Sequence, residues 1–296
     1  MAAPDATART LGDLLDAGAR WLGRRGVDEA RLQCEWLASA SLGRGRASLP
    51  LGEVPPQDVV EALRAGVVRL GEGEPLQYVL GEWDFRMLTL KTDRRALIPR
   101  PETEGLVGQV LAEPRLWGRG ASSGAGAPPS ICDVGTGSGA IALSLAFERP
   151  ACRVLATDCE EAALSLAREN AARLGLDGRI TFALGRNCAG AAPASLDAVV
   201  SNPPYIASAD VDALPRHIAG HEPRTALDGG ADGLDVIRGL VHDAAIALRR
   251  GGFIFMEIGD DQGAPVAALL ESAGFSEVGI SKDLAGRVRY AKGTIE

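Results

Sequence analysis

The stretch SICDVGTGSGAIALSLAFE, residues 130–148, decides the fold. A short apolar run is followed by a glycine-rich loop and then by an apolar segment of helical length, the loop being Gly135-Thr136-Gly137-Ser138-Gly139. Glycines at alternate positions let the backbone pass close to a ligand, and a helix directly after them offers free N–H groups at its start. The G-x-G-x-G spacing differs from the G-x-G-x-x-G of dinucleotide-binding folds. Because the loop stands between a strand and a helix, we interpret it as a cofactor loop rather than as a plain tight turn.

Outward from this loop, short apolar runs alternate with helical stretches such as residues 160–175. The candidate strands are SICDV (130–134), CRVLATD (152–158), RITFAL (179–184), LDAVVSN (196–202) and GFIFMEI (252–258), and two more are expected within residues 275–293. Alternation of this kind predicts an α/β fold, in which a mainly parallel sheet is covered by helices on both faces.

Three regions are expected along the chain. Residues 1–75 carry leucine and valine at helical spacing, which predicts a small helical bundle. Residues 76–98 partly alternate apolar and polar side chains, which predicts a β-hairpin connector. Residues 99–296 then form the α/β domain, which begins with a helix at 101–113. Residues 114–129 are rich in Gly, Ser, Ala and Pro and are expected to be a flexible surface loop.

Composition excludes several classes of protein. The 296 residues are 46% hydrophobic and 24% charged, which is typical of a globular chain and not of a disordered one. No apolar run is long enough for a membrane span, and the N-terminus lacks the apolar core of a secretory signal. The net charge of −8 argues against stable nucleic-acid binding, which needs a dense Lys/Arg patch. The five cysteines form no CxxC pair and are expected to be buried, reduced thiols, so the default compartment is the cytoplasm.

Asp158 is a second candidate for the cofactor site. It ends the candidate strand after the glycine-rich loop, 19 residues beyond Gly139. An acidic side chain at this place can accept hydrogen bonds from both hydroxyls of a ribose. An Asp here can equally cap the helix that follows. Next to a glycine-rich loop, ribose binding is the better interpretation.

The run Asn202-Pro203-Pro204-Tyr205 indicates the reaction. It follows a candidate buried strand, and its two prolines stiffen the backbone and remove two N–H donors. Nearby backbone carbonyls are therefore free to point outward. The Asn202 side chain adds another acceptor oxygen, and the Tyr205 ring offers a flat face. Two acceptors and an aromatic plane are suited to gripping a planar NH2 group.

Together these residues resemble class I S-adenosylmethionine-dependent methyltransferases that act on planar nitrogens. Within that class the chain is similar to the peptide chain release factor N(5)-glutamine methyltransferases, the PrmC/HemK family. The resemblance spans nearly the whole chain and rests on GEPLQYVLGEWDF, LIPRPETE (97–104), DVGTGSGAIAL, SNPPYI, HEPRTALDGGADGLD and LRRGGFIFMEIG. The NPPY motif alone is shared with adenine-amino methyltransferases, whereas PRPETE with the later EPRTALDGG is more specific.

The resemblance implies a Rossmann-like methyltransferase domain with a seven-stranded, mostly parallel sheet, behind a helical domain that helps to dock a class I release factor. It implies S-adenosyl-L-methionine as the cofactor, with its amino-acid part in the glycine-rich loop and its ribose on Asp158. Asn202, also expected beside the cofactor, and the carbonyl of Pro203 would accept the two amide hydrogens of the glutamine in a GGQ tripeptide. Pro204 and Tyr205 would lie beside that amide.

The sequence departs from the family pattern beside the adenine. Family members often carry an acidic residue followed by an aromatic one there, whereas this chain has Arg186, Asn187 and Cys188. Asn187 can still hydrogen-bond the adenine edge, and we expect Asn187 and Cys188 to replace the usual contacts.

The mechanism implied is electrostatic. Oxygens that accept both N–H hydrogens of an amide oppose the positive charge that grows on nitrogen during methyl transfer, so no strong general base is required. His217 and His221 have a spacing that could ligate a metal on a helix, but Gly220 and the flanking prolines argue against a helix there, and we expect no metal.

Two other functions are weighed against this one. An adenine-amino methyltransferase acting on nucleic acid is supported by NPPY alone and opposed by the acidic charge. A cofactor-binding module without catalysis, which holds a partner through residues 1–75, is opposed by the intact NPPY motif.

Overall fold

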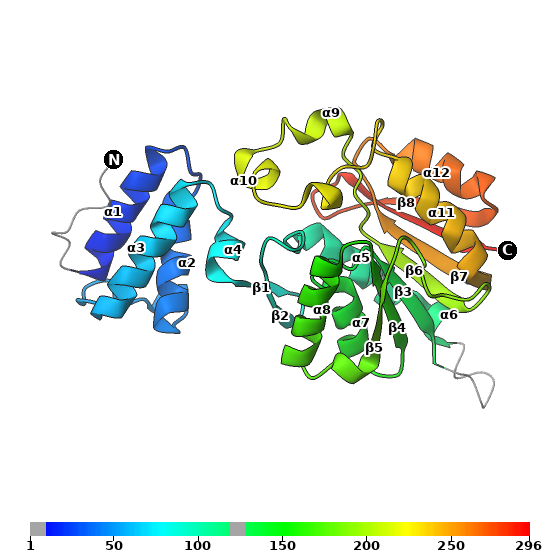
Figure 1. The fold of residues 1–296 in the computed structure, drawn as a ribbon, viewed down its shortest axis with the longest axis horizontal. Helices are drawn as coiled ribbons and strands as arrows, with labels where there is room; N and C mark the ends of the chain where they lie inside the picture. Colours follow the sequence, from blue (N-terminus) through cyan, green and yellow to red (C-terminus); the bar gives the residue numbers. More distant parts are fainter. Residues whose placement is uncertain (1–9, 119–127) are drawn as a thin grey trace. The chain divides into compact units, whose positions relative to one another are not determined.

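The computed structural model describes residues 10–118 and 128–296 (Figure 1). The chain divides into two compact units. The first contains the residues up to Glu82 together with Pro215–His221, and the second contains Trp83–Leu214 and Glu222–Glu296.

The first unit is a helical bundle. Its elements are α1 (Leu11–Gly23), α2 (Ala30–Leu42), the 3-10 turn η1 (Arg46–Ser48), α3 (Gln57–Gly71) and α4 (Leu76–Leu80). Helix α1 begins with a capping box, in which Thr10 and Asp13 satisfy each other's backbone N–H groups. Buried leucines of α1 and α3 pack with residues of α2, and the side chains of α4 lie against the same core. Helix α4 occupies residues that the sequence assigned to the extended connector, because Pro75 starts a turn of helix and Tyr78 is buried.

The predicted hairpin is shorter than residues 76–98. Its strands are β1 (Glu82–Phe85) and β2 (Leu88–Lys91), which form a separate two-stranded sheet. Phe85, Leu88 and Leu90 are buried in the core of the second unit.

The second unit contains the predicted seven-stranded sheet, in the order β5-β4-β3-β6-β7-β9-β8. The strands are β3 (Ser130–Val134), β4 (Arg153–Asp158), β5 (Ile180–Leu184), β6 (Leu196–Ser201), β7 (Leu248–Glu257), β8 (Phe275–Lys282) and β9 (Val288–Ile295). The first five are parallel, and β9 pairs antiparallel with both β7 and β8.

Helices cover both faces of this sheet (Figure 1). The core on one face includes residues of α5 (Pro101–Ala112), α7 (Ala140–Glu148) and α8 (Glu161–Arg173). The core on the other face includes residues of α11 (Asp235–Ala247) and α12 (Gly263–Ser272). The remaining short elements are α6 (Pro114–Trp117), η3 (Asp177–Arg179), α9 (Ser208–Val211), α10 (Arg216–Ala219) and η4 (Arg224–Ala226).

The strand order reverses at β3, and this reversal positions the site. β3 pairs with β4 on one side and with β6 on the other, with Val134 opposite both Thr157 and Ser201. The residues that follow these three positions therefore meet at one edge of the sheet. In open α/β sheets, ligands bind in the crevice outside the carboxyl ends of the strands at such a switch point.

Two expectations about local structure need correction. Residues 114–117 form helix α6 with Leu116 buried, because Pro114 fits the first position of a helix and Glu113 caps it. Residues 119–127 of the expected loop lie outside the described residues. The segment between Pro215 and Gly220 does form one helical turn, α10, which ends before His221. Within the described residues, no helix is both long and apolar enough to cross a bilayer.

Candidate active site

A cavity of about 670 Å³ lies within the second unit at the carboxyl ends of β3, β4 and β6. Its volume is within the usual range for small-molecule sites. Most residues that the sequence singled out line it, namely Gly135, Thr136, Gly137, Ser138, Asp158, Asn187, Asn202, Pro203 and Pro204.

The glycine-rich loop owes its shape to left-handed backbone. Gly135, Gly137 and Gly139 have φ angles of +69°, +56° and +87°. These values are strained for residues with a side chain. A Cβ on Gly139 would also lie 2.8 Å from Leu143, whereas a Cβ on Gly135 would meet nothing within 4 Å. Gly139 is therefore needed for packing, and Gly135 leaves backbone open to the cavity.

The buried carboxyl group of Asp133 and the half-buried one of Asp158 hold this loop. Oδ2 of Asp133 accepts hydrogen bonds from Thr136 Oγ1 at 2.6 Å and from the N–H of Ala142 at 3.0 Å. Burial raises the pKa of Asp133 to about 7. Asp158 accepts the N–H of Gly137 through Oδ2 and the N–H of Glu160 through Oδ1, both at 2.9 Å, and burial raises its pKa. Asp158 thus supports the loop and the start of α8 while it lines the cavity.

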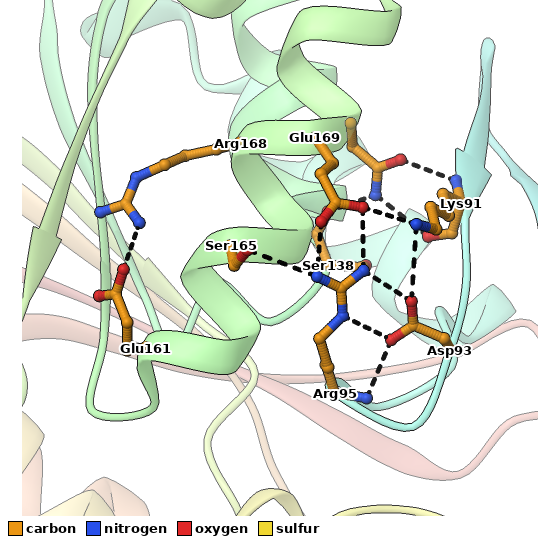
Figure 2. A network of polar contacts seen from close by, with 9 residues as sticks. Lys91, Asp93, Arg95, Ser138, Glu161, Ser165, Arg168 and Glu169 are labelled. Carbon is orange, nitrogen blue, oxygen red and sulfur yellow. Dashed lines mark hydrogen bonds and ion pairs between the residues drawn. The ribbon is translucent and has the colours of Figure 1, made fainter.

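A polar network fixes the loop from the side of α8 (Figure 2). The buried Asn170 donates hydrogen bonds to the carbonyls of Ser138, at 2.9 Å, and Lys91, at 3.1 Å. In Figure 2, Arg95 lies between Asp93 and Glu169, and it pairs with them at 2.7 and 2.6 Å. Because Arg95 also lines the cavity, these ion pairs anchor one of its walls to α8.

Hydrogen bonds to neighbouring elements hold the end of β6 and the residues that follow it. Ser201 donates from Oγ to the carbonyl of Val134 at 2.7 Å, which joins β6 to β3 where the glycine-rich loop begins. Asn202 donates from Nδ2 to Thr103 Oγ1 at 3.1 Å. Tyr205 packs against the core beside α12, and its carbonyl accepts from Gln262 Nε2 at 2.9 Å. Within the described residues, no hydrogen bond is donated to Asn202 Oδ1 or to the carbonyl of Pro203.

Sequence reasoning gave no role to Thr103 and Glu257, two residues that lie behind Asn202 and Tyr205. Glu257, the last residue of β7, is 2% exposed and accepts from Thr103 Oγ1 at 2.7 Å and from Tyr205 OH at 3.3 Å. Burial raises the pKa of Glu257, and it raises the pKa of Tyr205 to about 12. An ionisable residue within the apolar run GFIFMEI is the signal that could have found Glu257.

The adenine-side candidates are not brought together. Asn187 lines the cavity, but its Nδ2 donates to Asp243 Oδ2 at 2.8 Å and its carbonyl accepts from Thr157 Oγ1 at 2.6 Å. Cys188 is buried and lines a separate hollow of about 300 Å³. Cys159 differs from the expected buried thiols, because it is exposed at the cavity edge where β4 ends. Among the described residues, no three His, Cys, Asp or Glu side chains are grouped so that they could hold a metal ion.

Two family profiles match the chain. The Methyltransferase small domain matches residues 126–220, and the PrmC N-terminal domain matches residues 13–81. Among solved structures, the hMettl16 catalytic domain in complex with MAT2A 3'UTR hairpin 6 is similar with a TM-score of 0.55 at 17% identity, over 79% of this chain and 82% of that one. This likeness shows a shared methyltransferase fold.

Relatives from distant organisms match over nearly their full length. The release factor glutamine methyltransferase of Moorella thermoacetica is 42% identical over 95% of this chain and 96% of its own. The release factor glutamine methyltransferase of Deinococcus radiodurans is 40% identical over 95% of this chain and 97% of its own. The human MTRF1L release factor glutamine methyltransferase is 36% identical over 95% of this chain and 87% of its own. With the NPPY residues, the glycine-rich loop and Asp158 at one sheet edge, these matches show that the chain belongs to the release factor glutamine methyltransferase family.

Proposed function

We propose that this protein transfers a methyl group from S-adenosyl-L-methionine to the side-chain amide nitrogen of the glutamine in the GGQ motif of a class I peptide chain release factor. The observation that carries the proposal is the position of Asn202 and Pro203, which line the same cavity as the glycine-rich loop and Asp158. A translation factor as substrate makes the cytoplasm the proposed compartment.

The residues around the cavity fit the cofactor. Gly135 leaves room for close approach, and the start of α7 can receive a negatively charged carboxylate. Asp158 would accept from the ribose hydroxyls while it keeps the N–H groups of Gly137 and Glu160. Asn187 would face the adenine with its backbone, since its side chain is held by Asp243. Cys188 is left out of this proposal because it lies on the other hollow. When bound, the sulfonium supplies an electrophilic methyl group.

Asn202 Oδ1 and the Pro203 carbonyl would accept the two hydrogens of the substrate amide. An amide nitrogen is a weak nucleophile, because its lone pair is delocalised into the carbonyl. Fixed acceptor oxygens stabilise the positive charge that develops on nitrogen during transfer. Held beside the methyl group, the nitrogen needs little further ordering to react.

Tyr205 would pack beside the amide, not act as a base. Its hydroxyl donates to Glu257, and its pKa near 12 keeps the phenol protonated at neutral pH. The transition state would place developing positive charge near acceptor oxygens and an aromatic ring. The proton can leave afterwards to water, since a protonated amide nitrogen is a strong acid.

The helical first unit would supply affinity for the release factor. A glutamine flanked by glycines offers little surface, so much of the binding energy must come from contacts elsewhere on the partner.

The test is a methyl-transfer assay with purified protein and labelled S-adenosyl-L-methionine. The substrates are an intact class I release factor, the same factor with GGQ changed to GGE, a short GGQ peptide, and adenine-containing DNA and RNA. We expect label on the intact factor at its GGQ glutamine and none on the GGE factor. Label on the nucleic acids alone would overturn the proposal in favour of an adenine-amino methyltransferase. Cofactor binding without transfer to any substrate would indicate a binding module.

A further inference from the structure

A chain of hydrogen bonds leads from Asn202 into the protein interior. Asn202 Nδ2 lies 3.1 Å from Thr103 Oγ1, and Thr103 Oγ1 lies 2.7 Å from Oε2 of Glu257. Thr103 is 5% exposed and Glu257 is 2% exposed, so water does not compete for the hydrogen bond between them. Thr103 stands in the first turn of α5 and Glu257 at the end of β7, so the chain joins three elements at the cavity edge.

Counting protons fixes the direction of every bond in this chain. In its ionised form, which the nearby Arg289 guanidinium favours, the Glu257 carboxylate can only accept, so the single hydroxyl hydrogen of Thr103 goes to Glu257. The oxygen of Thr103 must then accept, and of the two polar atoms on the Asn202 amide only the nitrogen can donate to it. The NH2 group of Asn202 therefore faces Thr103, and Oδ1 faces the other way.

We propose that Thr103 and Glu257 are positioning residues, which hold the Asn202 amide with its oxygen toward the substrate. The inference rests on the proposed function, in which Asn202 Oδ1 accepts a hydrogen of the substrate amide. The oxygen and the NH2 group of an asparagine amide are similar in size, so packing alone hardly distinguishes the two orientations in which they exchange places. In the reversed orientation, an NH2 group would oppose the NH2 group of the substrate, and the acceptor would be lost.

Glu257 also fixes the other end of the NPPY motif. Its Oε1 accepts from the hydroxyl of Tyr205 at 3.3 Å. Arg289 lies behind this contact, with Nη1 3.4 Å from Tyr205 OH and 3.0 Å from the carbonyl of Ile258. One buried carboxylate therefore orients the acceptor side chain through Thr103 and holds the aromatic ring directly.

Nuclear magnetic resonance tests the orientation without reference to activity. In 15N-labelled protein, the side-chain NH2 signals of Asn202 are assigned by their loss in Asn202→Asp. We expect nuclear Overhauser effects from these hydrogens to the methyl group of Thr103, and their loss or a shift of the NH2 signals in Thr103→Val. Absence of the effects in the wild type, with the NH2 signals exchanging as freely as those of exposed asparagines, would overturn the inference.

Kinetics test the consequence. Thr103→Val keeps the shape of the side chain and removes the hydroxyl, and we expect kcat on the release factor to fall roughly tenfold or more. Thr103→Ser restores the hydroxyl and should recover most of the rate. A calorimetric Kd for S-adenosyl-L-methionine that is unchanged in both variants separates positioning from damage to the fold.

The outcomes separate the two proposals. If the wild type shows the expected Asn202 contacts but methylates no release factor, the proposed function fails and the orientation stands. If the wild type methylates the factor and Thr103→Val does so at the same kcat, the positioning role is overturned. A loss shared equally by Thr103→Val and Thr103→Ser would also overturn it, because the serine keeps the bond.

Discussion

Arg100 and Glu222 form an ion pair, 2.5 Å from Nη2 to Oε1, across 122 positions of sequence. The other oxygen of Glu222 accepts the backbone N–H of Ile98 at 3.1 Å. The Glu222 side chain is almost fully buried. The pair therefore joins the PRPETE run to the EPRTALDGG run, the two motifs that carry the family resemblance, and Ile98 and Arg100 both line the cavity.

Replacing Glu222 should destabilise this wall. Glu222→Ala leaves the Ile98 N–H and the Arg100 guanidinium without their acceptor, and we expect a loss of about 2 kcal/mol or more in the free energy of unfolding. Glu222→Gln keeps an oxygen for Ile98 and should lose less. Urea unfolding of the three proteins measures both values. Equal stability of Glu222→Ala and wild type would show that the pair contributes nothing.

Asn202→Ala should stop methyl transfer and leave cofactor binding nearly intact. Removal of one preorganised hydrogen-bonding group at a reacting centre typically lowers kcat by about 10²–10³-fold. Single-turnover rates on the release factor and a calorimetric Kd for S-adenosyl-L-methionine are the measurements. Near-normal turnover would mean that the acceptor lies elsewhere.

Asp158→Ala should weaken S-adenosyl-L-methionine binding by about 1–3 kcal/mol, the range for polar groups left unpaired. A cofactor analogue without ribose hydroxyls separates the ribose contact from support of the loop. The wild type should bind the analogue more weakly than the cofactor, and Asp158→Ala should bind both about equally. If Asp158→Ala still binds the cofactor more tightly than the analogue, to the same degree as the wild type, Asp158 makes no contact with the ribose. Its role is then limited to accepting the N–H groups of Gly137 and Glu160.

Asp133 should make stability depend on pH. Its pKa is raised by burial to about 7, so between about pH 4 and pH 7 the unfolded chain releases a proton that the folded protein keeps. The free energy of unfolding of the cofactor-free protein should therefore fall as pH rises through this window.

Asp133→Asn removes this titration. Its oxygen can still accept from Thr136 and Ala142, and its nitrogen takes the place of Oδ1, which has no partner among the described residues. The stability of the variant relative to wild type should increase from pH 5 to pH 8 by a few kcal/mol, about 1.4 kcal/mol per pKa unit. Denaturant titrations of both proteins at several pH values measure this difference. If the free energy of unfolding changes with pH in the same way in Asp133→Asn and in the wild type, the role of Asp133 is contradicted.

Deleting residues 1–81 should separate docking from chemistry. The cut removes α4 along with the bundle, because α4 packs in that core, and it keeps the hairpin with the second unit, which has its own core. We expect S-adenosyl-L-methionine binding to persist and KM to rise far more for the intact release factor than for a GGQ peptide. Steady-state kcat/KM on both substrates is the measurement. An equal loss on both would point to damage of the catalytic unit.

The elements of the second unit could be predicted because their signals are local. The runs that became β3, β4 and β6 are short and apolar, and the residues at their carboxyl ends carry the site. Parallel pairing then brings those residues together, whatever the length of the helices between them.

The partners behind the site could not be predicted, because they are set by tertiary packing. Thr103 meets Glu257 from 154 positions away, and nothing in the local pattern of either residue requires the other. Asn187 is a clear case of the same limit. Its side chain looked available for adenine, but Asp243 on α11 holds it. Pro75 gave a local signal for α4, yet the surrounding polar and apolar alternation favoured an extended segment.

The shared register of β3 with β4 and β6 limits where the chain can change length. Side chains alternate between the two faces of a strand, so one inserted residue in β3 would exchange the side chains that face the two cores and shift the glycine-rich loop relative to both Asp158 and Asn202. The turn between β8 and β9 bears no such constraint, because Leu284 is fully exposed and the turn joins the two outermost strands on that side. We therefore expect inserted residues to be tolerated at that turn, whereas a change of length in any of the three strands that carry the site should disrupt it.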